Sequence, residues 1–124
     1  MANPAIISIV DDDESVRMAL DGLLRSHGYT VQVFANAEAF LASNGPWTTA
    51  CLISDIQMPG LSGVQLHETL LGMGLHIPVI FISGNLRAFS KIQTTAPAAV
   101  AFFPKPFPCN ELIACIESVL NRPA

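Results

Sequence analysis

Residues 51–63, CLISDIQMPGLSG, pass from an apolar run to an isolated carboxylate and then to a turn-forming segment. Three other apolar runs also end in polar side chains: Ile6–Val10 before Asp11-Asp12-Asp13, Val79–Ile82 before Ser83-Gly84, and Val100–Phe103 before Lys105-Pro106. In an open parallel sheet, the carboxyl ends of the strands converge on one crevice in which ligands bind. Carboxylates, a hydroxyl and an ammonium gathered there suit a hard cation and a phosphoryl group.

The apolar runs alternate with helix-like segments, which is typical of βαβ units around a parallel sheet. The predicted strands are Ile6–Val10, Thr30–Phe34, Cys51–Ser54, Ile77–Ile82 and Val100–Phe103. Those that begin at Cys51 and Ile77 show little polar alternation, which indicates burial on both faces. We therefore predict an α/β fold with a doubly wound parallel sheet, formed by one domain over residues 1–124 with a core at about 5–120.

Helical periodicity is clearest in the segment that ends at His27-Gly28, where apolar residues recur at positions 16, 19, 20, 23 and 24. A second helix is predicted to start at the cap Asn36 and to turn Phe40 and Leu41 inward. A third follows Ser62-Gly63, with Val64, Leu66, Leu70 and Leu71 as its apolar residues. The segment Arg87–Thr95 predicts only a short or irregular helix, and the last helix spans about Asn110–Leu120 with Leu112, Ile113, Ile116, Val119 and Leu120 buried.

Composition excludes several classes of function. The chain has 124 residues, of which 51% are apolar and 13% charged, so it is long and apolar enough for a folded core. A net charge of -4 argues against nucleic-acid binding by this chain alone. No apolar stretch approaches the roughly 20 residues that span a bilayer, and no signal peptide is visible, so we expect no membrane partner.

The cysteines and histidines receive no chemical role. Cys51, Cys109 and Cys115 are odd in number and lack ligand spacing, and we interpret them as reduced core thiols of a cytoplasmic protein. The histidines at 27, 67 and 76 are expected near helix ends or on surfaces.

Taken together, the motifs resemble a response-regulator receiver domain of two-component signalling. They are Asp11-Asp12, Asp55 with Met58-Pro59 and Gly63, Ser83-Gly84, and Lys105-Pro106-Phe107. The resemblance covers Ile6 to about Leu120 and is closest to the subtype often fused to a helix-turn-helix output domain. It implies a flavodoxin-like (βα)5 sheet of order 2-1-3-4-5. It also implies a phosphoryl transfer from a sensor histidine kinase or phosphotransfer protein to Asp55, in a domain that catalyses only its own phosphorylation and dephosphorylation.

The resemblance assigns a role to each acidic residue. Asp55 is the nucleophile that forms an aspartyl phosphate, although a strand-end aspartate can also simply cap a turn. Asp12 is a direct Mg²⁺ ligand, Asp11 acts mainly through a water molecule, and the backbone carbonyl of Gln57 completes the site. Three carboxylates within a few ångströms repel by several kcal/mol at an effective dielectric near 20, which a divalent cation relieves. Alternatively, Asp11 and Asp12 only cap the first helix, but Asp13 or Glu14 fits the capping role better.

The hydroxyl and the ammonium are assigned to the phosphoryl oxygens. Ser83 donates a hydrogen bond to one oxygen and Lys105 pairs with another, whereas the alternatives are a helix cap and a solvated lysine. Pro106 is expected to follow a cis peptide bond. In the family, phosphorylation draws the hydroxyl inward and an aromatic residue, here Phe102, rotates into the vacated space. Alternatively, Phe102 is only a core aromatic.

The output surface is the part in which the sequence departs from the family pattern. Pro104 stands where a residue with an N–H is usual, which predicts a looser end of the last strand, and Pro97-Ala98 replace a helix-ending glycine. The surface implied by the resemblance combines the fourth helical segment, the fifth strand and the fifth helix. Its partner is a second copy of the chain or a downstream output partner.

Two alternatives come from other classes of function. A haloacid-dehalogenase-type phosphohydrolase would use Asp11 as nucleophile, but the chain is short, no acidic motif follows Lys105, and Asp55 would be unexplained. A degenerate receiver that acts only as a binding module usually lacks one acidic residue, the lysine or the hydroxyl, and none is missing here. A flavodoxin is excluded because no Ser/Thr/Gly-rich phosphate loop follows the first strand.

Overall fold

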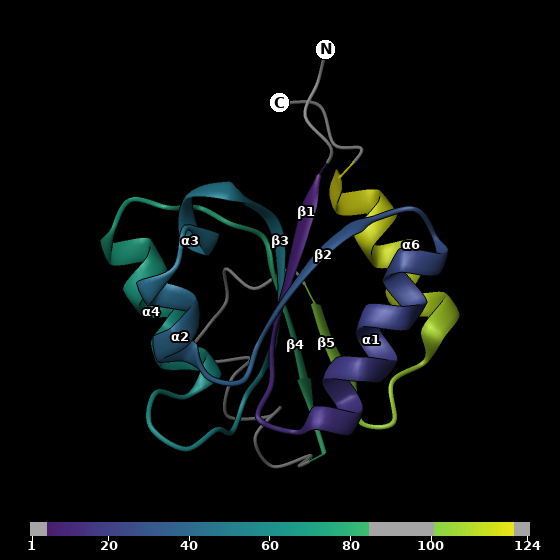
Figure 1. Ribbon diagram of the computed structural model, residues 1–124, viewed down its shortest axis with the longest axis horizontal. Helices are drawn as coiled ribbons and strands as arrows, with labels where there is room; N and C mark the ends of the chain where they lie inside the picture. Colours follow the sequence, from purple (N-terminus) through teal and green to yellow (C-terminus); the bar gives the residue numbers. More distant parts are fainter. Residues whose placement is uncertain (1–4, 85–100, 121–124) are drawn as a thin grey trace.

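The structure is a computed structural model that describes residues 5–84 and 101–120. Within these residues the chain forms a five-stranded parallel sheet of order β2-β1-β3-β4-β5, which confirms the predicted fold class (Figure 1). The strands are β1 (Ile6–Val10), β2 (Thr30–Phe34), β3 (Thr49–Asp55), β4 (Val79–Ser83) and β5 (Ala101–Pro104). The predicted helix Arg87–Thr95, Pro97-Ala98 and Val100 lie outside the described residues.

The strand bounds agree closely with the prediction at β1 and β2 and differ elsewhere. β3 extends beyond both predicted ends, from Thr49 to Asp55. β4 begins at Val79 instead of Ile77, because Pro78 has no N–H to donate to a neighbouring strand. β5 continues through Pro104, and the N–H of Lys105 donates to the Ser83 carbonyl at 2.9 Å. The predicted loosening at Pro104 is therefore wrong, since the next residue supplies the bond.

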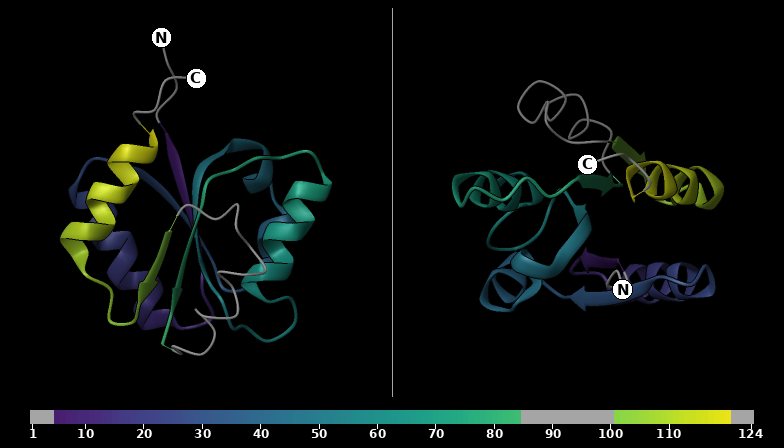
Figure 2. Two further views of the ribbon diagram at one scale, coloured as in Figure 1. Left: turned by 180° about the vertical axis from the view of Figure 1, so that it is seen from behind. Right: turned by 90° about the horizontal axis from the view of Figure 1, so that it is seen from above.

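Helices cover both faces of the sheet (Figure 2). The helices are α1 (Glu14–Ser26), α2 (Ala37–Ala42), α3 (Gly45–Thr48), α4 (Gly63–Gly72) and α6 (Cys109–Leu120). α1 and α6 lie on one face, and α2, α3 and α4 lie on the other. The four-residue helix α3 was not predicted.

Two apolar cores result, one on each side of the sheet. Alternate residues of one strand enter different cores: Ile7 and Ile9 of β1 pack with α1 and α6, whereas Val10 packs on the other side with Phe40 of α2 and Leu66 of α4. Because both faces are covered, the central strands have no exposed side, which explains their lack of polar alternation.

The helix ends follow the local sequence signals. Asp13 caps α1 by accepting from the N–H groups of Ser15 and Val16, and Asn36 caps α2 as predicted. Gly28 follows the end of α1 with a positive φ of 87°, a conformation that glycine adopts without strain. Ser62 and Gln65 form a reciprocal capping box at the start of α4.

Two predictions about exposure are wrong. His67 is 3% exposed in the middle of α4, where its ring packs edge-on against Phe81 at a centroid distance of 5.9 Å. Cys109 is exposed at the start of α6, so it is not a core thiol, whereas Cys51 is fully buried.

Candidate functional site

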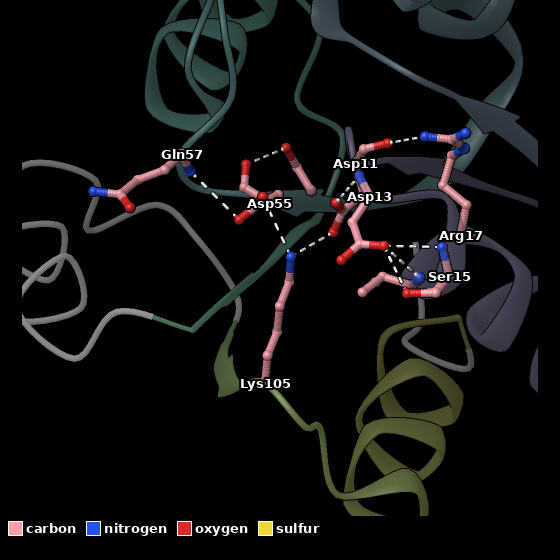
Figure 3. Close-up of polar contacts among 9 residues, drawn as sticks. Asp11, Asp13, Ser15, Arg17, Asp55, Gln57 and Lys105 are labelled. Carbon is pink, nitrogen blue, oxygen red and sulfur yellow. Dashed lines mark hydrogen bonds and ion pairs between the residues drawn. The ribbon is translucent and has the colours of Figure 1, made fainter.

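The candidate site lies where the strands end at their carboxyl termini. Asp11 follows β1, Asp55 is the last residue of β3, Ser83 is the last residue of β4, and Lys105 follows β5. Strand register aligns these ends, since Val10 lies opposite Ser54 and Ser83 lies opposite Pro104. Figure 3 shows Asp11, Asp55 and Lys105 pointing toward one another. The sequence motifs are thus brought together as expected.

Lys105 forms ion pairs with two of the carboxylates. Its Nζ lies 2.9 Å from Oδ2 of Asp11 and 3.3 Å from Oδ2 of Asp55 (Figure 3). Asp11 is fully buried and Asp55 is 6% exposed, so these charges are poorly screened by water. One ammonium therefore holds two carboxylates in place.

The protonation equilibria reflect the burial of these groups. Burial raises the pKa of Asp55, and the negative charge of Asp11 raises it further, while Lys105 and the N–H of Gln57 only partly oppose this. Burial by itself would lower the pKa of Lys105, but its hydrogen bond with Asp11 and the charges of Asp11 and Asp55 outweigh burial and raise it. The lysine is therefore held firmly in its charged form, whereas the buried carboxyl of Asp55 takes up a proton more readily than an ordinary aspartate does.

The acidic residues fit a divalent cation. Asp11, Asp12 and Asp55 each offer a carboxylate oxygen, and these oxygens lie within 4.8 Å of one another. Oδ2 of Asp11 is buried, and its contact among the described residues is the ion pair with Lys105. Asp12 is exposed at the edge of the cluster. An all-oxygen set open to solvent on one side is what Mg²⁺ prefers, because it keeps several of its water molecules.

The turn after Asp55 holds its carboxylate and its backbone. The N–H of Gln57 donates to Oδ1 of Asp55 at 3.4 Å, and the hydroxyl of Ser54 donates to the Asp55 carbonyl at 2.9 Å. The N–H of Gly63 donates to the carbonyl of Ile56 at 2.9 Å, which brings the start of α4 against β3. A Cβ on Gly63 would overlap the carbonyl oxygen of Asp55, so this close approach requires glycine.

Ser83 and Phe102 lie on the neighbouring strands β4 and β5. Ser83 is 2% exposed. Phe102 is partly buried against the core on the α4 side and stacks on Phe81, with ring centroids 5.8 Å apart and planes inclined by 25°. The peptide bond between Lys105 and Pro106 is cis.

One contact of the site was missed by the sequence analysis. Nη1 of Arg17, in α1, donates to the backbone carbonyl of Asp11 at 2.7 Å (Figure 3). The available signal was a basic residue close to the N-terminus of a helix, a position that disfavours cations.

No described helix combines the length and the apolar character that a membrane crossing requires.

Comparisons with known proteins agree with the geometry. A model of the response regulator receiver domain matches residues 7–117. The response regulator protein TmoT of Ectopseudomonas mendocina is 40% identical over 117 residues, which cover 94% of this chain and 53% of TmoT. The transcriptional regulatory protein FixJ of Rhizobium meliloti is 36% identical over 111 residues, covering 90% of this chain and 54% of FixJ. The chain thus spans about half the length of these curated relatives.

Solved structures show the same fold. FixJ-N superposes with a TM-score of 0.83 at 33% identity, covering 100% of this chain and 98% of that chain. The response regulator StyR gives a TM-score of 0.81 at 37% identity, covering 95% of this chain and 60% of that chain.

Proposed function

Because this chain belongs to the family of response regulator receiver domains, we propose that Asp55 accepts a phosphoryl group from a histidine kinase or phosphotransfer protein. Phosphorylation then switches a protein–protein contact. The observation that carries the proposal is the buried cluster in which Lys105 holds Asp11 and Asp55 together at the end of the sheet. Neither the phosphohydrolase nor the purely binding receiver is favoured by the family match.

The transfer uses the carboxylate of Asp55 as nucleophile. One of its oxygens attacks phosphorus in line, an O–P bond forms, and the N–P bond of the phosphohistidine breaks with its electron pair going to the imidazole nitrogen. The attack requires the ionised carboxylate. Burial opposes ionisation of Asp55, whereas the charge of Lys105 favours it, and this supports a role for the lysine before the transfer.

Asp11, Asp12, Asp55 and the backbone carbonyl of Gln57 would hold Mg²⁺. When bound, the ion neutralises the carboxylates and the charge on the phosphoryl oxygens. Oδ2 of Asp11 is buried and faces the Lys105 ammonium at 2.9 Å, so a cation bound there would share this oxygen with the lysine. The exposed position of Asp12 leaves room for the water molecules that Mg²⁺ retains.

After the transfer, Lys105 pairs with a phosphoryl oxygen and Ser83 donates to another. A lysine that already contacts two carboxylates needs only a small side-chain rotation to follow the new charge. Movement of Ser83 is coupled to Phe102, which rotates and changes the surface of β5 and α6. This surface contacts a second copy of the chain or an output partner.

The chemical step is tested by intact-mass spectrometry after incubation with acetyl phosphate, with and without Mg²⁺. The wild type gains one phosphoryl group only with Mg²⁺, and Asp55→Asn gains none. Asp21→Asn, which changes an aspartate of α1 paired with Arg25 and remote from the acidic cluster, serves as the matched control and is modified like the wild type. An adduct that still forms on the Asp55→Asn variant contradicts the assignment and indicates that another residue is the nucleophile.

The output step is tested by sedimentation of the free and beryllofluoride-treated protein over a wide concentration range. A shift toward dimers, or a gain of affinity for an output partner, supports the switch. If the free and the beryllofluoride-treated protein sediment alike and bind an output partner alike, the switch is contradicted, while the phosphorylation chemistry is left intact.

A further inference from the structure

Arg17 occupies a position that its charge alone would not favour. It is the fourth residue of α1 (Glu14–Ser26), close to the helix N-terminus, where the exposed N–H groups already carry partial positive charge. Its guanidinium turns back toward the strand that precedes the helix and donates to the Asp11 carbonyl at 2.7 Å (Figure 3). Local conflicts of this kind in natural proteins tend to mark functional positions.

The hydrogen bond from Arg17 is one of two that hold the backbone of Asp11. On the other side, the N–H of Asp11 donates to the carbonyl of Phe34 at the end of β2, at 3.1 Å. Oδ1 of Asp11 accepts from the N–H of Asp13 at 2.8 Å. With the backbone held at both polar groups and Oδ1 engaged, Oδ2 of Asp11 is directed toward Asp55 and Lys105.

We propose that Arg17 is a positioning residue of the cation site: it holds the β1–α1 turn so that the carboxylates of Asp11 and Asp12 are preorganised for Mg²⁺. This inference rests on the proposed function for the identity of the ion. Arg17 touches the backbone of Asp11 and acts through it. Loss of a partner that orients a metal ligand typically weakens metal affinity by about 10–100-fold.

Charge and position predict opposite effects on cation binding. A guanidinium near the site repels a divalent cation, so removal of the charge alone strengthens Mg²⁺ binding. Removal of the bond that orients Asp11 weakens it. The sign of the change therefore separates positioning from simple electrostatics.

Arg25 provides a matched control on the same helix. Its Nη2 donates to the Val31 carbonyl of β2 at 3.0 Å, so it too joins α1 to a strand carbonyl, but far along the helix from the acidic cluster. Arg25→Met and Arg17→Met each delete one such bond and one positive charge. Only Arg17→Met removes a bond to a residue of the cation site.

The experiment is a calorimetric Mg²⁺ titration of wild type, Arg17→Met, Arg17→Lys and Arg25→Met, with thermal unfolding of each in chelator. Arg17→Met is expected to bind Mg²⁺ about tenfold more weakly. Arg17→Lys, which keeps a donor and a charge, recovers part of the affinity, and Arg25→Met binds like the wild type. Unchanged or tighter binding by Arg17→Met overturns the proposal.

Two further readouts distinguish this proposal from the proposed function. In the metal-free protein, hydrogen exchange of the Asp13 amide should be faster in Arg17→Met than in Arg25→Met, and equal rates in the two variants contradict the positioning role. Mg²⁺ binding without a phosphoryl adduct on the wild type contradicts phosphorylation and leaves the role of Arg17 intact. A wild type that binds no Mg²⁺ overturns both.

Discussion

Substitution of Gly63 by alanine tests how closely α4 must approach the nucleophile. Gly63 is the first residue of α4, and an added Cβ would overlap the carbonyl oxygen of Asp55 and lie 3.1 Å from the Cα of Ile56. Both neighbours are backbone atoms, so neither can rotate away. The helix or the end of β3 must move instead.

The expected cost follows from two opposing contributions. Overpacking of this kind costs about 1–3 kcal/mol, and contact with backbone places it in the upper half of that range. The lower backbone entropy of alanine in the unfolded chain returns about 0.4–1 kcal/mol. The net loss is about 1–2.6 kcal/mol, which for a domain of this size corresponds to roughly 4–10 °C in Tm.

Gly72→Ala is the matched control, because it lies in the same helix and a Cβ there meets nothing within 4 Å. It should stabilise the protein by about 0.4–1 kcal/mol. Urea unfolding followed by circular dichroism measures both variants, and the rate of phosphoryl adduct formation measures the effect on Asp55. If Gly63→Ala is as stable as Gly72→Ala, the close approach does not constrain the site and the reasoning is wrong.

Three other predictions follow from the caps, the buried histidine and the acidic cluster. Ser62→Ala removes half of the capping box on α4 and should lower the unfolding free energy by about 1 kcal/mol in urea. Burial lowers the pKa of His67 below its ordinary value of 6.5. The unfolded chain therefore binds more protons just below pH 6.5, and stability should fall as the pH drops through that region. His67→Leu should remove this part of the pH dependence, and an unchanged slope in urea unfolding between pH 7.5 and 5.5 would contradict it. At a Mg²⁺ concentration of 100 Kd, the wild type should gain about 2.7 kcal/mol of stability. At that same concentration Asp12→Asn should gain far less, yet in chelator it should be at least as stable as the wild type because one fewer carboxylate repels its neighbours. Equal Mg²⁺ stabilisation of both proteins would exclude Asp12 as a ligand.

The sheet and the acidic cluster were predictable because the sequence marks strand ends with polar residues. Asp11, Asp55, Ser83 and Lys105 each follow or end an apolar run, and parallel pairing brings such ends together without knowledge of side-chain packing. The division of the chain into helices and strands was also predictable, because periodicity and helix caps are local signals. Strand lengths were less certain, as the start of β4 after Pro78 illustrates.

Packing between elements was harder to predict. His67 belongs to the buried stripe of α4 with Gly63, Leu66 and Leu70, so its spacing indicated burial even though its polarity suggested a surface. Arg17 reaches a carbonyl of the preceding strand, a contact that no linear pattern encodes. The four-residue helix α3 is shorter than the window in which periodicity can be recognised.

Because Cys51 is buried and Cys109 is exposed, labelling of the thiols can report the unfolding of this chain. Burial, aided by nearby Cys115, raises the pKa of Cys51 to about 12, and the side chain lies in the central strand β3. Only the thiolate is alkylated, so in the native state Cys51 is doubly protected, by burial and by protonation. Cys109 is exposed and open to reagent. The rate at which Cys51 gains a label, distinguished by peptide mass from labels on Cys109 and Cys115, measures how often the middle of the sheet opens.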